Sequence, residues 1–251
     1  MSEPTPLRPH ADLDRYYGGG ETGRRSFVRT IFDQTAGDYD GVERMMALGT
    51  GSWYRRRALE RSGLAAGARV LDVAIGTGLV AREAIALAGS PGRVVGLDPS
   101  AGMLAQARRG LAVPVVLGTG ESLPFADASF DFLSLGYALR HLADLRAAFA
   151  EFLRVLRPGG IVCVLEITPP RSGPQRALLR LYVRGVIPLL SRLTRRRRET
   201  ALLWRYFWDT MAGCVPPDDV LAALAAAGFA DAGRFVELGM FSEYTGRRPG
   251  S

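Results

Sequence analysis

A short apolar segment that ends in two glycines constrains the fold of this chain more than any other feature. Residues 69–74 read Arg-Val-Leu-Asp-Val-Ala, and Ile-Gly-Thr-Gly follows before an apolar, helix-forming stretch. A run of this kind is typical of a parallel strand covered on both faces. Gly76 and Gly78 allow a sharp turn into the helix and a close approach of the backbone to a ligand. The segment therefore predicts a strand–turn–helix unit with a ligand at its turn.

The same alternation of apolar strands and amphipathic helices continues along the chain. It predicts a doubly wound parallel sheet, and two final apolar segments around Gly239 predict a closing hairpin. The fold class expected is α/β: a Rossmann-like, seven-stranded, mostly parallel sheet with a C-terminal antiparallel hairpin and a helical cap. The predicted strands span residues 69–74, 93–97, 113–117, 130–135, 161–167, 233–238 and 240–245.

One domain is expected rather than two. The chain has 251 residues, 47% of them hydrophobic, which suffices for one sizeable core. Residues 1–25 are polar and rich in Pro, Gly and Arg, and we predict that they form a flexible tail. The single domain then spans 26–251, with a long, Arg-rich helical insertion over 171–212 that breaks the strand–helix alternation.

Cysteine usage and hydropathy bear on the compartment and on metals. The two cysteines, Cys163 and Cys214, form no CxxC pair, so we expect neither a disulfide framework nor a metal site. The first 20 residues contain no apolar stretch, so no secretory signal is expected. No apolar run approaches the ~18 residues that a membrane span requires. The predicted location is cytoplasmic.

An acidic residue follows the second strand and points to a nucleoside ligand. Asp98 lies 20 residues beyond Gly78, where a carboxylate can accept hydrogen bonds from both ribose hydroxyls. Gly76, Gly78 and Ala81 also satisfy the dinucleotide fingerprint G-x-G-x-x-G/A, which allows NAD. Asp72, four residues before Gly76, would repel a pyrophosphate but suits a ligand ammonium group. S-adenosylmethionine (SAM) is therefore the predicted cofactor, and an NAD-dependent oxidoreductase is the alternative.

Further motifs resemble those of the ubiquinone/menaquinone biosynthesis methyltransferases, a branch of the class I SAM-dependent methyltransferases. The similarity covers residues 28–246, most of the chain. The N-terminal Phe-Asp and Tyr-Asp pairs and the Ala-Leu-Arg element point most narrowly to this branch. The matching pieces are Ile31-Phe-Asp33, Tyr39-Asp40, Leu71-Asp-Val-Ala74, Gly76-Thr-Gly78, Leu97-Asp98, Met103-Leu104, Glu121-Ser-Leu-Pro-Phe125, Ser129-Phe-Asp131, Leu139-Arg140, Arg154-Val-Leu-Arg-Pro-Gly-Gly160 and Leu165-Glu166.

The resemblance implies which residues hold the cofactor. It places SAM contacts at Thr77, Asp98, Thr119, Gly120 and Gly136, and it implies that Tyr39 covers the cofactor from the N-terminal helices. The full set of predicted cofactor-binding residues is Tyr39, Asp72, Gly76, Thr77, Gly78, Asp98, Met103, Thr119, Gly120 and Gly136.

Four positions depart from the family pattern. Thr119 stands where the family has Asp or Asn as the acceptor for the adenine amino group, and a threonine hydroxyl can still accept one bond. His141 replaces an Asn, Gly136 replaces a Ser, and Tyr244 replaces a His. These changes cluster around the acceptor end of the site.

Arg140 and His141 are the predicted catalytic residues. Methyl transfer from a sulfonium depends mainly on in-line positioning, and a base is needed only where the nucleophile loses a proton. His141 follows the fourth strand and can serve as that base or have a structural role. Arg140 falls where the family has an arginine that positions or activates groups near the acceptor. It can hold a hydroxyl, an anion or a water, or pair with Asp144 or Glu166.

The charge pattern bears on partners. The net charge is +7, but residues 171–205 alone carry ten arginines and one acid, so the remainder sums to +7 − 9 = −2. Three interpretations of this segment stay open: a cap that contacts an anionic membrane through 176–198, a solvated helix face, and a phosphate-binding patch at Arg195–Arg198. Nucleic acid is the least favoured partner, because the charge is not spread over the chain.

The acceptor is expected to be lipophilic. Aromatic residues of the cap can line an apolar pocket or simply pack in the core: Trp53, Tyr54, Trp204, Tyr206, Phe207 and Trp208. The predicted function is SAM-dependent methyl transfer to carbon or oxygen of a quinone-like or polyketide-like small molecule. The alternative outside enzymes is a SAM-binding regulatory or RNA-binding protein. The NAD alternative lacks the Tyr-x-x-x-Lys arrangement of many hydride-transfer enzymes, because the chain has no lysine.

Overall fold

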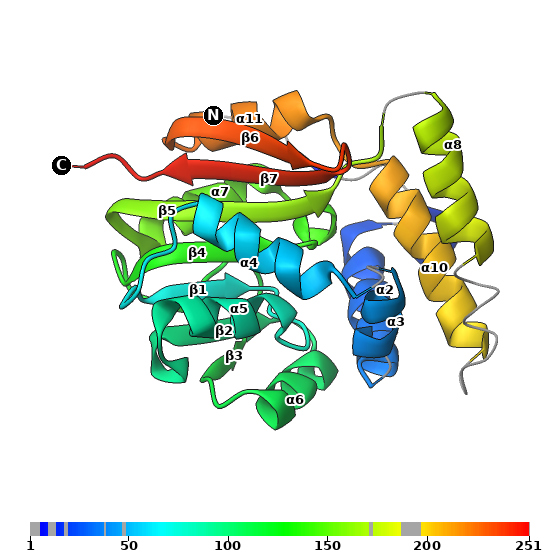
Figure 1. The fold of residues 1–251 in the computed structure, drawn as a ribbon, viewed down its shortest axis with the longest axis horizontal. Helices are drawn as coiled ribbons and strands as arrows, with labels where there is room; N and C mark the ends of the chain where they lie inside the picture. The colour runs from blue at the N-terminus through cyan, green and yellow to red at the C-terminus, as the bar shows by residue number, and fades with distance from the viewer. Residues whose placement is uncertain are drawn as a thin grey trace.

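A seven-stranded sheet with helices on both faces forms the centre of the molecule (Figure 1). The strand order is β3-β2-β1-β4-β5-β7-β6; β1 to β5 run parallel, and β7 is antiparallel to β5 and to β6. The strands are β1 (Val70–Val73), β2 (Val94–Asp98), β3 (Val115–Leu117), β4 (Phe130–Gly136), β5 (Leu156–Ile167), β6 (Ala230–Glu237) and β7 (Phe241–Arg247). The predicted fold class is confirmed.

The computed structural model describes residues 6–9, 14–17, 20–37, 39–46, 49–170, 173–186 and 197–250. The helices preceding and within the alternating part are α1 (Asp14–Tyr17), α2 (Gly20–Thr35), α3 (Tyr39–Met46), α4 (Gly51–Arg61), α5 (Leu79–Ala88), η1 (Pro91–Arg93), α6 (Ala101–Gly110), η2 (Leu139–His141) and α7 (Leu145–Val155). The later helices are α8 (Pro174–Leu181), the π-helical turn η3 (Tyr182–Val186), α10 (Arg197–Ala212) and α11 (Pro217–Ala226).

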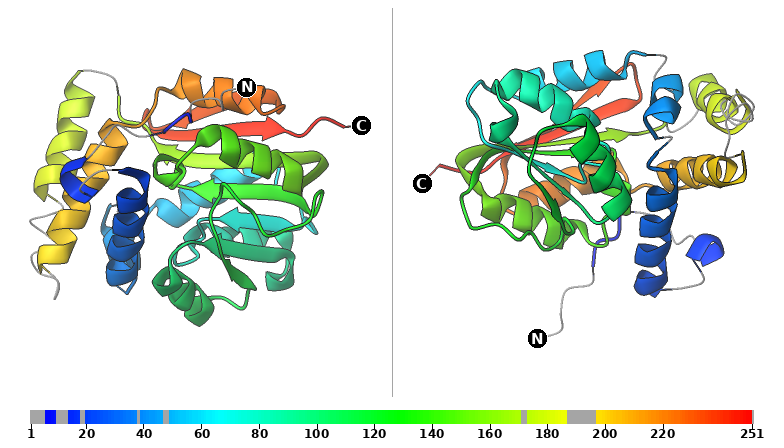
Figure 2. Two further views of the ribbon diagram at one scale, coloured as in Figure 1. Left: turned by 180° about the vertical axis from the view of Figure 1, so that it is seen from behind. Right: turned by 90° about the horizontal axis from the view of Figure 1, so that it is seen from below.

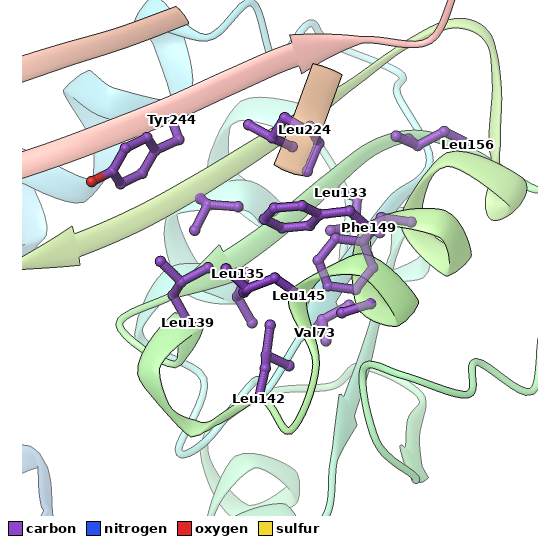
Figure 3. Packing of buried hydrophobic residues seen from close by; sticks show 14 of the residues in the cluster. Val73, Leu133, Leu135, Leu139, Leu142, Leu145, Phe149, Leu156, Leu224 and Tyr244 are labelled. Atoms are coloured by element: carbon purple, nitrogen blue, oxygen red, sulfur yellow. The ribbon is translucent and has the colours of Figure 1, made fainter. Parts of the chain in front are cut away.

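Two hydrophobic cores lie on opposite faces of the sheet. On one face, α7 and α11 pack against the central strands through residues such as Phe149, Phe152 and Leu224, and part of this cluster is drawn in Figure 3. On the other face, α4, α5 and α6 contribute residues such as Leu59 and Leu104. The central strands are therefore covered on both faces, which explains why their sequences are continuous apolar runs.

A helical cap stands over the carboxyl ends of the parallel strands, away from the C-terminus of the chain (Figures 1 and 2). Helices α2 and α10 contact each other, and α10 also contacts η3. Val183, Trp208 and Met211 form a small separate core inside the cap. Ligands of open α/β sheets bind beyond the carboxyl ends of the strands, so the cap covers the place where a ligand is expected.

The N-terminal region differs from the predicted flexible tail. Residues 20–25 are the first turns of α2, and Arg24 within them is only 4% exposed. Further upstream, the backbone N–H of Leu7 donates to Asp144 Oδ1 at 3.0 Å, and the Leu7 carbonyl accepts from the N–H of Leu145. These described residues of the predicted tail therefore contact the domain, whereas residues 1–5, 10–13 and 18–19 lie outside the described residues.

Strand β5 is longer than predicted, and the insertion after it is described only in part. Strand β5 begins at Leu156, five residues before the predicted start, because Leu156 pairs with Phe130 across a local irregularity in the β4–β5 register. The predicted insertion over 171–212 is helical where it is described, as α8, η3 and α10. Residues 187–196, and with them part of the segment predicted to contact a membrane, lie outside the described residues. Within the described ranges, no helix is long and apolar enough to cross a membrane.

Candidate cofactor and acceptor site

A cavity of about 740 Å³ lies between α2 and the carboxyl ends of β1, β2 and β3. Its floor includes Ala74, Pro99 and Gly118, each from a turn that follows a strand. Its roof comes from α2. The lining residues are Thr22, Arg24, Arg25, Ser26, Val28, Arg29, Val73, Ala74, Leu97, Pro99, Leu117, Gly118, Thr119, Gly120, Glu121, Ala138, His141 and Leu142. The cavity thus lies where the sequence predicted the cofactor.

The turn after β1 has the backbone conformation that its glycines permit. Gly76 has φ 58° and Gly78 has φ 94°, both in the left-handed region. A Cβ atom on Gly78 would lie 2.3 Å from Leu111 Cδ1, so the position has no room for a side chain. Gly78 is the N-cap of α5 and supplies no capping side chain. The first N–H groups of α5 therefore need other acceptors, and the Asp72 carboxylate faces the N–H of Ala81.

Asp98 ends β2 and is almost completely buried at 6% exposure. Its two oxygens each accept one backbone N–H, from Gly76 and from Ser100, at 2.8 Å. Burial raises the pKa of Asp98 to about 6, although both hydrogen bonds oppose this rise. The carboxylate thus ties the glycine turn to the end of β2, and its neighbours Leu97 and Pro99 line the cavity although Asp98 itself does not.

Asp72 and Thr77 each bury a polar atom without a hydrogen-bond partner among the described residues. Asp72 is 1% exposed; its Oδ1 accepts the Ser134 hydroxyl at 2.6 Å, while Oδ2 has no partner. The hydroxyl oxygen of Thr77 is likewise unpartnered. Burial raises the pKa of Asp72 to about 7. Such orphaned atoms are costly, and a ligand that brings an ammonium group and hydroxyls fits them.

Asp33 has a role that the sequence did not predict. It lies on α2, and its Oδ1 accepts the Ser100 hydroxyl at 2.5 Å and the Gly102 N–H at 2.9 Å. Ser100 in turn caps α6, because its Oγ accepts the N–H of Met103. The roof helix is therefore anchored to the N-terminus of α6, next to Asp98. The Phe-Asp pair of the N-terminal motif was the only signal in the sequence for this position.

The other predicted cofactor residues lie in the cavity wall, in the packed interior or on the N-terminal helices. Thr119 and Gly120 line the cavity. Met103 is 2% exposed, and Gly136 packs against α5, where a Cβ would lie 2.5 Å from Val80 Cγ2. Tyr39 begins α3, with its ring 6.2 Å from that of Phe32 on α2, and burial raises its pKa. The binding role of each residue stays a prediction.

His141 lies in the cavity wall and is held by aromatic neighbours. Its ring stacks on Tyr206 at 5.7 Å and meets Phe32 edge-on at 5.3 Å. Its Nδ1 is 3.3 Å from the Tyr206 hydroxyl, and its backbone carbonyl accepts from Arg24 Nη1 at 2.9 Å. The contact with Tyr206 of α10 was not predicted, because nothing in the sequence relates two positions 65 residues apart.

Arg140 makes one of the two ion pairs that the sequence left open. Its Nη1 donates to Glu166 Oε1 at 2.5 Å, and both side chains are buried. The other candidate, Asp144, instead caps α7 by accepting the Arg146 N–H at 3.0 Å. Arg140 also lies over the ring of Phe207, at 4.6 Å from its centroid.

No metal centre is indicated in the described part of the chain, since it holds no group of three or more His, Cys, Asp or Glu side chains with suitable geometry. Thr119 in the cavity wall and the two buried carboxylates behind it fit the polar groups of SAM. Asp98 would accept ribose hydroxyls, Asp72 Oδ2 would face the ammonium group, and Thr119 would accept the adenine amino group. When bound, SAM supplies an electrophilic methyl group on a sulfonium.

Comparison with known proteins agrees with this assignment. The family model described as the ubiE/COQ5 methyltransferase family matches residues 21–239. A ubiquinone/menaquinone biosynthesis C-methyltransferase of Hahella chejuensis is 34% identical over 197 residues, covering 76% of this chain and 78% of that protein. A demethylmenaquinone methyltransferase of Thermus thermophilus is 34% identical over 228 residues, covering 87% of this chain and 100% of that protein.

Solved structures show the same fold. A SAM-dependent methyltransferase of Thermotoga maritima superposes with a TM-score of 0.62 at 19% identity, covering 87% of this chain and 99% of that one. A SAM-dependent methyltransferase of Aquifex aeolicus gives 0.55 at 20% identity, covering 77% and 88%.

The predicted methyltransferase activity and the predicted SAM cofactor are confirmed by these matches, which favour them over an NAD-dependent oxidoreductase. The family model spans the roof helix, the glycine turn, Asp98 and the Arg140–Glu166 pair in one continuous match. The chain therefore belongs to the ubiE/COQ5 methyltransferase family.

Proposed function

We propose that this chain transfers the methyl group of SAM to a ring carbon of a lipophilic quinone precursor in its reduced, hydroxylated form. The observation that carries the proposal is the 34% identity to a demethylmenaquinone methyltransferase over that protein's whole length. The Hahella relative is named as a C-methyltransferase, which favours carbon over oxygen as the methylated atom.

The cap of the structure suits an acceptor of this kind. Tyr206 and Phe207 of α10, together with Phe27 and Phe32 of α2, place aromatic rings around His141 and Arg140. Aromatic side chains arranged in this way favour the binding of a planar, apolar ring. Trp204, another aromatic residue predicted to line the pocket, has a side chain outside the described set.

The cofactor half of the proposal is tested by calorimetric binding of SAM, S-adenosylhomocysteine and NADH. Asp98→Ala should weaken binding of both SAM-type ligands by about 10- to 150-fold, because a charged hydrogen bond to the ribose contributes ~1.5–3 kcal/mol. Asp127→Ala removes a carboxylate whose side chain is 76% exposed and serves as the matched control. Binding of NADH in preference to SAM would overturn the assignment.

The acceptor half is tested by incubating the protein with SAM carrying a ¹³C-labelled methyl and with demethylmenaquinol in detergent micelles. The expected product carries the label on a ring carbon, and its ¹³C shift distinguishes a C-methyl from an O-methyl group. A phenolic polyketide offered in parallel tests the other predicted acceptor class. Exclusive O-methylation, or turnover of the polyketide alone, would contradict the proposal.

We further propose that α8 rests on an anionic membrane surface, from which a lipophilic acceptor can enter. Leu178 is 68% exposed and Leu181 is 63% exposed. Arg176, Arg180 and Arg184 follow each other at four-residue spacing, and residues 173–186 contain no acid. Arginines near an anionic surface contribute about 1 kcal/mol each, so three of them favour binding by ~3 kcal/mol in addition to the apolar contact.

Flotation with liposomes tests the membrane contact. The protein should float with vesicles that contain anionic lipid and not with neutral ones. A Leu178→Ser/Leu181→Ser variant should lose flotation, while Leu238→Ser, which alters a 71% exposed residue of the β6–β7 turn, should retain it. Equal recovery with both vesicle types would remove this proposal without affecting the methyltransferase assignment.

A further inference from the structure

An incompletely satisfied ion pair lies at the carboxyl end of β5. Glu166 is 1% exposed and Arg140 is 3% exposed. Glu166 Oε1 accepts two hydrogen bonds, from Arg140 Nη1 and from the N–H of Ile167 at 2.8 Å. Its second oxygen, Oε2, has no hydrogen-bond partner among the described residues, and neither does Arg140 Nε. The pair therefore has one free acceptor and one free donor.

An ion pair with only a structural role would not be expected to leave a buried acceptor and a buried donor unsatisfied. Buried charges persist where their remaining hydrogen-bonding capacity is also satisfied, because a partly satisfied network costs more than an apolar replacement. An acceptor and a donor left free on one buried pair match a hydroxyl group, which donates its hydrogen to the carboxylate and accepts from the guanidinium. The reduced ring of the proposed acceptor carries such a hydroxyl.

The pair lies directly behind the cavity wall, although neither of its side chains is part of the lining. Arg140 belongs to η2, which follows β4, and its neighbour His141 lines the cavity. The strand order places β4 and β5 on the side of β1 away from β2, the strand that carries Asp98. Phe207 of the cap covers the guanidinium. A ring between the cofactor and the cap would thus have its hydroxyl near Glu166.

Other polar groups nearby are less suited to take a proton. Burial raises the pKa of Tyr137, with Glu166 among the charges that raise it further, and burial raises the pKa of Cys214 to about 12. Both groups therefore remain protonated at neutral pH. The ring of His141 packs between Tyr206 and Phe32, and its Nδ1 already has the Tyr206 hydroxyl as a partner at 3.3 Å.

We propose that Glu166 is the proton acceptor for the ring hydroxyl and that Arg140 positions it; this assignment rests on the proposed function. The hydroxyl proton moves to Glu166 Oε2, and the oxygen electron pair enters the ring and makes the adjacent carbon nucleophilic. That carbon forms a bond to the methyl group as the carbon–sulfur bond of the sulfonium breaks. The carbon then loses its own hydrogen as a proton and the ring oxygen regains one. The reaction releases one proton overall, together with S-adenosylhomocysteine.

Glu166→Gln tests the assignment. Removing a general base lowers kcat by about 10²–10⁴-fold, so we expect a loss of at least 100-fold with little change in acceptor KM and in the Kd for S-adenosylhomocysteine. Glu243→Gln is the matched control: Glu243 is 2% exposed and paired with Arg61. It pairs with Leu165 across the β5–β7 ladder, so its side chain lies on the opposite face of the sheet from that of Glu166. This variant should keep kcat within about threefold.

A second readout separates proton transfer from structural support. A halogen on the acceptor ring makes its hydroxyl more acidic, so that the hydroxyl ionises without a base. With such an acceptor, the ratio of the wild-type kcat to the Glu166→Gln kcat should fall by about tenfold or more. If Glu166→Gln folds poorly, the Arg140→Gln/Glu166→Gln double variant removes both buried charges. It should recover stability but stay at least 100-fold slower than wild type.

Three outcomes would overturn the assignment. A Glu166→Gln variant with near-normal kcat would do so, as would a rate gap independent of acceptor acidity, or a double variant that regains activity. If the wild type fails to methylate demethylmenaquinol and the halogenated acceptor, the proposed function itself has failed. This result can be told apart from a failure of the Glu166 assignment, in which the wild type is active and only the behaviour of the variants differs from the expectation.

Discussion

Replacing Asp72 by Asn should stabilise the cofactor-free protein, and the gain should depend on pH. Asp72 is 1% exposed; its Oδ1 accepts the Ser134 hydroxyl, and the backbone N–H of Ala81 is the only other group that stabilises the carboxylate among the described residues. Burial raises its pKa from 3.8 to about 7. The asparagine keeps an oxygen for Ser134 and removes the charge. The variant therefore isolates the energetic cost of burying an ionised carboxylate at the cofactor site.

The sign and size follow from linkage between proton binding and folding. Because the folded pKa lies above the unfolded one, the folded wild type binds more protons between pH 4 and 7, and its stability falls as pH rises through that window. Asp72→Asn lacks this dependence. Each pH unit below the folded pKa corresponds to 1.36 kcal/mol, so the advantage of the variant should grow by about 3 kcal/mol from pH 5 to pH 8. For a domain of this size that is ~6–12 °C in Tm.

Thermal or urea unfolding of both proteins without cofactor, at pH 5, 6, 7 and 8, measures this difference. Asp127→Asn, at an exposed position, is the control and should show no such trend. A stability difference that stays constant over this range, or that shrinks as pH rises, would refute the argument that Asp72 is a buried carboxylate with a raised pKa. In the presence of saturating SAM the wild type should be the more stable of the two proteins, because the variant lacks the carboxylate that would face the ammonium group.

Three further predictions concern the roof, the packing and the cavity wall. Asp33→Ala removes the acceptor of the Ser100 hydroxyl and the Gly102 N–H, so the Kd for S-adenosylhomocysteine, measured by calorimetry, should rise about tenfold; an unchanged Kd would show that anchoring α2 is irrelevant to binding. Gly136→Ala places a Cβ 2.5 Å from Val80 Cγ2 and should lower the free energy of unfolding by ~1–3 kcal/mol, and Val80→Ala in the same chain should restore most of it; failure of that rescue would contradict the steric explanation. His141→Ala should change kcat less than tenfold and leave the pH dependence of kcat unaltered, since its ring is held by Tyr206 and Phe32; a lost pH limb would identify His141 as the base instead.

Much of the cofactor half of the site could be predicted from local sequence. The glycine turn follows a strand directly, and the left-handed conformations of Gly76 and Gly78 depend only on the residues of that turn. Asp98 ends the next strand, so parallel pairing of β1 with β2 brings it to the same edge. The carboxylate then accepts the Gly76 N–H, although the two lie 22 positions apart.

The N-terminal and acceptor regions could not be predicted in the same way. Composition suggested a tail for residues 1–25, whereas the start of α2 forms part of the cavity roof and buries Arg24. The partner of Arg140 stayed open between Asp144 and Glu166, because both are acids at plausible positions. The partner depends on how the elements pack: Asp144 caps α7, whereas Glu166 lies at the end of β5 beside η2 and pairs with Arg140.

The strand–helix alternation, the cofactor turn and the family could thus be predicted from the chain, because they depend on periodicity and on residues close together in it. The helix that covers the cavity, the carboxylate that pairs with Arg140 and the buried atoms without a described partner became known from the folded molecule. Those features depend on side chains that meet from distant parts of the chain, such as Asp33 with Ser100 and Tyr206 with His141. No local pattern encodes such contacts, since they arise from the way the cap packs against the sheet.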